Sequence, residues 1–308
     1  MPDVVITEFM DEDAVAALSA RFDCLYDPAL VDRPEDLAAL LGDARALIVR
    51  NRTQVREAVL GAAPKLSCVG RLGVGLDNID VAACKARGVA VYPATGANDD
   101  AVAEYVVTAA LVLLRGAWHA TDRVAAGEWP RQALMGREVG GKTLGLIGFG
   151  SIARQTARRA AALGMRIAAH DPFLPEGDPA WKDAERMDLE RLAAEADVLS
   201  LHVPLTDGTR HMVNADLLSR MKPDAILVNA ARGGVVDEAA LAAALRAGRL
   251  GGAALDVFEE EPLTAAGGAK YDGLNVILTP HVAGVTQEAN VRVSSMIADR
   301  VAAHLDAL

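Results

Sequence analysis

The sequence predicts an α/β protein built from two doubly wound domains, each with a parallel sheet. Short apolar runs alternate with helical patterns along almost the whole chain, which is typical of parallel sheets covered by helices on both faces. The chain of 308 residues also exceeds the usual size of a single hydrophobic core. Apolar residues make up 52% of the chain and aromatic residues only 4%, so Ala, Val and Leu supply most of the buried volume.

Five apolar runs predict the strands of the first domain, with helices between them. They are Val4 to Ile6, Arg21 to Leu25, Ala46 to Val49, Leu66 to Val69 and Val89 to Val91. A long helix from about Asp99 to Arg115 then interrupts the alternation and is expected to cross to the second domain. An irregular stretch through Trp129-Pro130 and Gly140-Gly141 follows this helix.

Six further runs predict the sheet of the second domain. They are Leu144 to Ile147, Arg166 to Ala169, Val198 to Leu201, Ala225 to Val228, Gly252 to Leu255 and Val276 to Leu278. The final helix, about Gln287 to Ala307, has no strand after it and is expected to pack back on the first domain. The predicted domains are therefore residues 1–98 plus 285–308, and residues 99–284.

Charge and cysteine content restrict the ligands and the compartment. A formal net charge of −11 argues against nucleic acid and anionic membranes as partners, so any anionic ligand needs a local cationic pocket. Cys24, Cys68 and Cys84 are odd in number and lack metal-ligand spacing, which predicts reduced thiols, a cytoplasmic location and no metal site. The apolar helix 101–114 is too short to span a bilayer, and a soluble protein is expected.

Charged side chains follow three consecutive strands in the last third of the chain. The segments are Asn229-Ala230-Ala231-Arg232-Gly233-Gly234, Asp256-Val257-Phe258-Glu259-Glu260-Glu261-Pro262 and Thr279-Pro280-His281-Val282-Ala283-Gly284. Ligands of open α/β sheets bind outside the carboxyl ends of the strands, so an Arg, a Glu and a His are expected to meet at one edge. These groups suit the transfer of a hydride and a proton to or from an anionic carbonyl compound.

A glycine-rich turn after the run 144–147 predicts a dinucleotide site. Gly148 permits the tight turn, and Gly150 lets the backbone approach a pyrophosphate. The helix that begins at Ser151 and Ile152 supplies N–H groups and a positive dipole end. Asp171 follows the next strand, about where a carboxylate receives the ribose hydroxyls. That acid would repel a 2′-phosphate, so NAD is expected rather than NADP.

A second glycine cluster, residues 70–78, also follows a strand, but the next strand is not followed by a ribose-binding acid. It is therefore a poor dinucleotide site. Its glycines could leave the N–H groups of Val74 and Gly75 free to bind a small carboxylate, or the cluster could be a purely structural turn.

These segments resemble the family of D-isomer-specific 2-hydroxyacid dehydrogenases over nearly the whole chain. The matching motifs are Gly70 to Asp80, the glycine loop at Gly148, His202-Val203-Pro204-Leu205-Thr206, the Arg232 segment, Asp256 to Pro262 and Thr279 to Gly284. The resemblance implies a flavodoxin-like, split substrate domain, an inserted Rossmann domain that binds NAD, and a homodimer held largely by the latter. Within the family, the chain looks most similar to phosphoglycerate dehydrogenases and bacterial sulfolactate dehydrogenases.

The resemblance also assigns residues to roles. It implies that Arg232, Glu261 and His281 are the catalytic residues and selects Glu261, directly before Pro262, among the three acids. The expected cofactor residues are Val74, Gly148, Gly150, Ser151, Ile152, Asp171, Val203, Pro204, Ala230, Arg232, Asp256, His281 and Gly284.

The expected mechanism follows from the side chains. His281 would exchange a proton with the substrate oxygen while a hydride is exchanged with NAD(H). Arg232 would hold the carboxylate and polarise the carbonyl, and Glu261 would orient and stabilise the imidazolium. Asp256 fits a partner for the nicotinamide carboxamide. His202 also follows a strand, but no acid is positioned to support it as a base.

Extra cations predict the substrate class. Arg50, Arg52 and Arg71 follow strands of the first domain, and together with Val74, Gly75 and Arg232 they form the expected substrate-binding set. Several cations suggest a second anionic group, as in 3-sulfolactate or 3-phosphoglycerate, although these arginines could instead pair with surface acids.

Three other functions stay open at this level. The chain could be a reductase of simple keto acids such as glyoxylate or hydroxypyruvate, or an NAD-sensing corepressor without turnover. A formate dehydrogenase is the third, but that branch pairs its His with Gln, and Glu261 argues against it.

Overall fold

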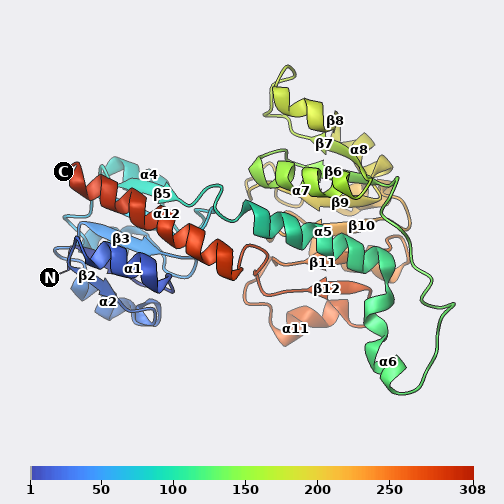
Figure 1. The fold of residues 1–308 in the computed structure, drawn as a ribbon, viewed down its shortest axis with the longest axis horizontal. Helices are drawn as coiled ribbons and strands as arrows, with labels where there is room; N and C mark the ends of the chain where they lie inside the picture. Colours follow the sequence, from blue (N-terminus) through green and yellow to red (C-terminus); the bar gives the residue numbers. More distant parts are fainter. Residues whose placement is uncertain (1) are drawn as a thin grey trace. The chain divides into compact units, whose positions relative to one another are not determined.

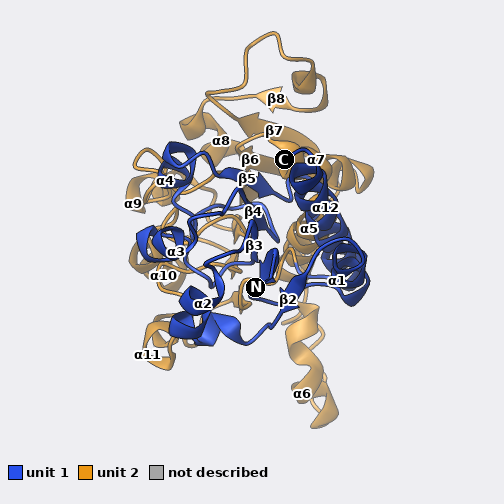
Figure 2. Cartoon of the chain, turned by 90° about the vertical axis from the view of Figure 1, so that its left-hand side faces the viewer, with its two compact units in different colours: residues 1–98, 285–308 blue, residues 99–284 orange. Residues whose placement is uncertain are grey.

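The structure is a computed structural model that describes residues 2–308, and it divides into two compact units. Unit 1 comprises Met1–Asn98 and Val285–Leu308, and unit 2 comprises Asp99–Gly284 (Figure 2). Each unit is built around its own sheet and its own hydrophobic cores.

Unit 1 contains a five-stranded, fully parallel sheet in the order β2-β1-β3-β4-β5. This is the flavodoxin-like order that was predicted. Its strands are β1 (Val4–Ile6), β2 (Cys24–Tyr26), β3 (Ala46–Val49), β4 (Cys68–Arg71) and β5 (Ala90–Pro93). Its helices are α1 (Glu12–Ser19), η1 (Leu30–Asp32), α2 (Pro34–Leu40), α3 (Glu57–Ala62), α4 (Val81–Ala86) and α12 (Gln287–Asp306).

Alternate residues of the unit 1 strands face opposite sides of the sheet, because side chains along a strand alternate. Val4 and Ile6 pack with α1 and α12, whereas Val5 packs with the helices of the opposite face, α2, α3 and α4. Helix α12 begins after Thr286, whose hydroxyl accepts the Ala289 N–H, and it lies beside α1 (Figure 1). The last helix of the chain therefore belongs to the core of unit 1.

Unit 2 contains a seven-stranded, fully parallel sheet in the order β12-β11-β10-β9-β6-β7-β8. This is the strand order of a dinucleotide-binding Rossmann fold, with the order reversing at β6 and β9. The strands are β6 (Thr143–Ile147), β7 (Arg166–His170), β8 (Glu185–Arg186), β9 (Val198–Leu201), β10 (Ile226–Asn229), β11 (Gly252–Leu255) and β12 (Val276–Leu278).

The helices of unit 2 cover both faces of its sheet (Figure 1). Helices α5 and α7 share one core with β6, and helices α8, α9 and α10 share the other. The helices are α5 (Asp99–Arg115), η2 (Ala117–Ala120), α6 (Thr121–Ala125), α7 (Ser151–Ala162), η3 (Pro179–Asp183), α8 (Leu189–Glu195), α9 (Ala215–Arg220), α10 (Glu238–Arg246), α11 (Ala265–Gly268) and η4 (Ala269–Tyr271).

The sequence predictions of fold class and of most strands are confirmed, with three differences. Six strands were expected in unit 2, but β8 adds a seventh, because two exposed polar residues carry no apolar pattern. Strands β2 and β4 begin later than expected, so that Arg71 ends β4 instead of following it. The short helix α6 lies after α5, where no helix was predicted.

Among the described residues, no single helix has the length and apolar composition to cross a membrane. The bent pair Asp99–Arg115 and Ala117–Ala125 passes that test together, by length and composition only.

Candidate active site

The three predicted catalytic residues follow neighbouring strands of unit 2. Strands β10, β11 and β12 are adjacent and parallel, so the segments that follow them lie at one edge of the sheet. Arg232 follows β10, Glu261 follows β11 and His281 follows β12. The sheet topology therefore places all three at the edge where open α/β sheets bind ligands.

His281 and Glu261 form a hydrogen-bonded pair. The His281 Nδ1 lies 2.8 Å from Glu261 Oε2, and the other carboxylate oxygen accepts the Phe258 N–H at 3.0 Å. Burial by itself would raise the pKa of Glu261, but these hydrogen bonds and the charges of His281 and Arg232 lower it. Glu261 is thus an anion, so His281 donates Nδ1–H to it and leaves Nε2 for a substrate.

The segment that carries Arg232 is fixed by its own side chains and by a close approach of backbone. Buried Asn229 accepts the Ala231 N–H and donates to the Arg232 carbonyl oxygen, which closes the turn. A Cβ atom on Gly233 would lie only 1.7 Å from the Phe258 carbonyl oxygen. Glycine at this position therefore lets the Arg232 segment pack against the segment that carries Glu261.

Asp256 is buried beneath the His281 segment. Its Oδ1 accepts the Thr279 hydroxyl at 2.6 Å and the Val282 N–H at 2.8 Å, and its Oδ2 accepts the Ala283 N–H at 2.8 Å. The carboxylate thus holds the turn in which His281 has a φ of +56°. The Oδ2 atom of Asp256 keeps one lone pair as an acceptor. The hydrogen bond from the nicotinamide carboxamide to Asp256 stays a prediction.

A hydroxyl chain connects Asp256 to helix α5. The Thr279 hydroxyl donates to Asp256, so it accepts at 2.6 Å from the Tyr105 hydroxyl. Burial raises the pKa of Tyr105, although its hydrogen bond to Thr279 opposes this, and the phenol stays protonated. Neither Thr279 nor Tyr105 was predicted as a site residue. A tyrosine in an apolar helix does not by itself indicate a functional site, so nothing in the sequence connected Tyr105 with the His281 segment.

The glycine-rich turn has the geometry of a phosphate site. Gly148 has a φ of +86°, and a Cβ there would lie 2.5 Å from the His202 carbonyl oxygen. No heavy atom lies within 4 Å of where a Cβ on Gly150 would be, and no side chain caps α7, which begins with Ser151 and Ile152. The first N–H groups of this helix are thus open to an anion.

Asp171 lies beside this turn. Its Oδ2 accepts the Phe149 N–H at 2.9 Å and its Oδ1 accepts the Phe173 N–H at 2.9 Å. The carboxylate is therefore oriented by the turn, and each oxygen keeps acceptor capacity for a ribose hydroxyl.

His202 follows β9 and is half-buried. Burial lowers the pKa of its imidazole to about 4, and its Nε2 lies 3.0 Å from the Ser200 hydroxyl. A ring that is neutral near pH 7 cannot donate a proton as an imidazolium. Of the two residues after it, Val203 is half-buried and Pro204 is exposed.

Glu259, two residues before Glu261, belongs to a separate cluster. It accepts from the His211 ring and from the Glu238 N–H, while buried Glu238 accepts from Lys270 and Tyr271. This cluster fixes the acidic segment from its other side, so that Glu261 alone of the three acids is bonded to His281.

The predicted substrate residues of unit 1 differ in their surroundings. Arg50 is half-buried and donates to Phe9 O and to Asn290 Oδ1, whereas Arg52 is exposed and forms an ion pair with Asp32. Arg71 folds back over Gly73 and donates to the Leu72 carbonyl oxygen at 2.9 Å. Val74 and Gly75 are both half-buried in the loop that follows.

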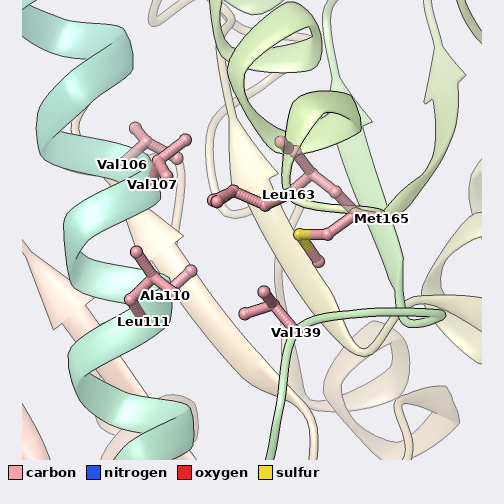
Figure 3. A pocket seen from close by; sticks show the side chains of 9 residues that line it. Val106, Val107, Ala110, Leu111, Val139, Leu163 and Met165 are labelled. Carbon is pink, nitrogen blue, oxygen red and sulfur yellow. The ribbon is translucent and has the colours of Figure 1, made fainter.

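A further hollow in unit 2 is entirely apolar. Val106, Val107, Ala110 and Leu111 of α5 face Leu163 and Met165 across it (Figure 3). Such a lining offers no donor to an anion, so this hollow is not a candidate substrate site.

The family of the chain follows from comparison with known proteins. A family model described as D-isomer specific 2-hydroxyacid dehydrogenase, NAD binding domain, matches residues 107–283. The chain belongs to this family. The match covers most of unit 2, which contains the glycine-rich turn and the Arg232, Glu261 and His281 segments.

Individual relatives extend the similarity to the whole chain. The (S)-sulfolactate dehydrogenase of Chromohalobacter salexigens is 56% identical over 98% of this chain and 97% of its own length. The hydroxypyruvate reductase of Thermotoga maritima is 41% identical over 97% of this chain and 96% of its own length. The crystal structure of a D-lactate dehydrogenase from Aquifex aeolicus, complexed with NAD and lactic acid, matches with a TM-score of 0.85 at 29% identity, over 99% of this chain and 96% of that one.

This chain is therefore an NAD-dependent oxidoreductase acting on the CH–OH group of 2-hydroxy acids. The expected family, cofactor and reaction type are confirmed. The corepressor alternative, without turnover, is not supported.

Proposed function

We propose that this protein interconverts a 2-hydroxy acid that bears a second anionic group, such as 3-sulfolactate, and the corresponding 2-keto acid. The main support for this reaction is the hydrogen-bonded pair of His281 and Glu261. Their Nδ1 and Oε2 atoms lie 2.8 Å apart, next to the Arg232 segment. The relative from Chromohalobacter salexigens, named for sulfolactate, supports the substrate class. Arg50, a half-buried cation after β3, supports a second anion.

The geometry of the site supports a role for each of three residues. Arg232 presents a planar fork of N–H donors that suits the substrate carboxylate and the carbonyl oxygen. His281 holds the transferred proton at Nε2, because its Nδ1 is bonded to Glu261. Glu261 keeps the ring in one orientation and stabilises its protonated form.

The glycine-rich turn fits NAD. The open position at Gly150, the uncapped start of α7 and the oriented carboxylate of Asp171 suit a pyrophosphate and a ribose diol. Bound NAD supplies the hydride acceptor, and NADH the donor. The proposed cofactor set is completed by Val74, Val203, Pro204, Ala230, Asp256 and Gly284.

A carboxylate at position 171 repels a 2′-phosphate, so kcat/KM should strongly favour NADH over NADPH. Equal efficiency with both would remove this role from Asp171.

The substrate is tested by a screen with the purified protein. NADH oxidation is followed with sulfopyruvate, phosphohydroxypyruvate, hydroxypyruvate, glyoxylate and pyruvate at matched concentrations. We expect the highest kcat/KM for a keto acid with a sulfonate or phosphate at its far end. If kcat/KM were highest for glyoxylate or pyruvate, the proposal that the substrate bears a second anionic group would be wrong.

A hydroxypyruvate reductase is the second candidate. It is favoured by the relative from Thermotoga maritima, which is 41% identical over nearly the full length. The same screen separates the two, because hydroxypyruvate carries a hydroxyl where sulfopyruvate carries a sulfonate.

We further propose that the protein is a homodimer formed through the segment between α5 and β6. Trp118, Trp129 and Met135 of this segment are 65%, 76% and 82% exposed, so the segment offers large apolar side chains for a second copy of the chain to bury. Trp129→Ser with Met135→Ser should lower the mass measured by sedimentation to that of one chain. Phe173→Ser, an exposed aromatic elsewhere in unit 2, is the matched control.

We also propose a cytoplasmic location. It is supported by the free thiols of Cys24, Cys68 and Cys84, because disulfides are rare in the cytoplasm.

A further inference from the structure

A buried glutamate organises the loop that carries the two candidate arginines of unit 1. Glu8 follows β1 and is only 4% exposed. Its Oε1 accepts the N–H groups of Arg50 at 2.9 Å and Thr53 at 3.0 Å, and its Oε2 accepts those of Asn51 at 3.3 Å and Arg52 at 3.1 Å. One carboxylate therefore binds four successive N–H groups of the loop 50–53.

This arrangement is a backbone anion site that the protein fills with its own carboxylate. Successive N–H groups that point into one concavity bind anions. Burial by itself would raise the pKa of Glu8, but the N–H groups of Thr53, Arg50 and Arg52 outweigh burial and lower it. Because Glu8 occupies the concavity, a substrate anion cannot use the backbone of this loop and must be bound by side chains.

The loop is also fixed from its outer side. Buried Asn78 donates to the Thr53 carbonyl oxygen at 2.7 Å, and the Thr53 hydroxyl lies 2.8 Å from that of Thr7. The Val55 N–H donates to the Asn78 carbonyl oxygen at 2.8 Å. The direction in which the loop presents its arginines is thus set by buried contacts and not by solvent.

The two arginines are held differently by this loop. Arg52 is exposed and already neutralised by Asp32, which is 58% exposed. The Arg50 guanidinium donates at 2.6 Å to the Asn290 Oδ1 and at 3.3 Å to the Phe9 carbonyl oxygen, and both of these acceptors are neutral. Within residues 2–308, no carboxylate forms an ion pair with Arg50. The Glu8 carboxylate acts on the Arg50 guanidinium through space only, because its oxygens are bound to backbone N–H groups. A partly desolvated cation that no carboxylate contacts gains more from a bound anion than an exposed cation that already has an ion-pair partner.

We propose that Glu8 is a positioning residue for substrate specificity: by filling the concavity of the loop 50–53, it directs Arg50, rather than Arg52, to bind the second anion of the substrate. This inference rests on the proposed function. The group that Arg50 binds is a sulfonate or a phosphate, which are both anions with three terminal acceptor oxygens. Parallel assays with sulfopyruvate and phosphohydroxypyruvate distinguish these two sources.

The test compares two values of kcat/KM in each variant, one for the doubly anionic keto acid and one for glyoxylate. Glu8→Gln has almost the same shape, but its amide offers one acceptor oxygen and turns an NH₂ donor toward N–H groups. We expect the ratio of the two values to fall about 10-fold or more, as when one charged hydrogen bond is lost, with a much smaller change for glyoxylate. Glu8→Asp keeps the charge and should lower the ratio less than Glu8→Gln.

The remaining variants separate the arginines. Arg50→Met should lower the ratio about 10-fold or more, and Arg52→Met should lower it less. Asp43→Asn, which removes the exposed ion-pair partner of Lys65 elsewhere in unit 1, is the matched control and should leave the ratio unchanged. These comparisons remain decisive if Glu8→Gln does not fold.

Four results would overturn the inference. Equal losses on both substrates in the Glu8 variants would show a purely structural role, and a larger effect of Arg52→Met than of Arg50→Met would reverse the assignment. If the wild type prefers a doubly anionic substrate but Arg50→Met keeps the ratio, the inference fails and the proposed function stands. If the wild type has no such preference, the proposed substrate class fails and the inference fails with it.

Discussion

At the scale of single residues, His281 and Glu261 give the sharpest prediction. His281→Ala removes the group that exchanges the substrate proton, so kcat should fall roughly 100-fold or more while NADH binding is nearly kept. Steady-state kinetics and titration of NADH fluorescence measure the two quantities. Turnover close to that of the wild type would move the proton exchange to another group.

Glu261→Gln tests the pair from the other side. The amide can still orient the ring, but it supplies no charge to the imidazolium. The pH profile of keto acid reduction should therefore shift to lower pH, because the protonated ring loses its counter-charge. An unchanged profile would leave Glu261 with an orienting role alone.

Glu8 predicts a pH dependence of stability. Its pKa is lowered in the folded protein, so its stabilising effect is complete above its unfolded pKa, about 4.3, and is lost as the pH falls through the lower folded value. Glu8→Gln should therefore cost about 2 to 4 kcal/mol of unfolding free energy at pH 7 and less below about pH 4. Urea unfolding at several pH values measures this difference. Glu12→Gln, an exposed acid of α1, is the control, and an equal, pH-independent loss in both variants would contradict the prediction.

At the scale of elements, helix α5 acts on the His281 segment through one hydroxyl chain. Tyr105→Phe removes the hydroxyl that donates to Thr279, which in turn donates to Asp256 beneath His281. We expect kcat/KM to fall about 3- to 10-fold, corresponding to one hydrogen bond of about 1 kcal/mol.

Tyr92→Phe provides the matched control for this change. It removes the same atom from a half-buried tyrosine in unit 1, where the hydroxyl lies 3.0 Å from the His304 ring. Its kcat/KM should stay at the wild-type value. Equal kinetics in the two variants would show that the hydroxyl chain from α5 does not position His281.

The elements also show what the sequence could predict. The buried strands β1, β3, β9 and β11 have the predicted bounds, because runs of three or four residues between turns are too short for a helix. Strand β8 could not be predicted, since two exposed polar residues pair only with the edge of β7. Tertiary structure decides such an element, and no local propensity reveals it.

The candidate site also contains residues that the sequence could predict and residues that it could not. Charged residues after strands were visible in the sequence, because strand order places them at one edge. The partners of such residues were not visible. Glu8 binds backbone N–H groups 42 to 45 residues away in the sequence, and the Thr279 hydroxyl donates to the carboxylate of Asp256, 23 residues before it. Glu8 lies 42 residues before Arg50, and only the parallel pairing of β1 with β3 brings the two together.

At the scale of the whole molecule, two units with separate sheets and cores predict two unfolding transitions. NAD binds unit 2, so by mass action it should stabilise that unit by about 2.7 kcal/mol at a free concentration 100 times its Kd. For a domain of this size the shift is roughly 5 to 10 °C in the midpoint of one transition, and the other should barely move. Differential scanning calorimetry with and without NAD measures both midpoints. NADP at the same concentration is the matched control and should shift the same transition much less, because Asp171 repels its 2′-phosphate. A single transition that NAD moves as a whole would contradict this prediction and would mean that the two units unfold cooperatively.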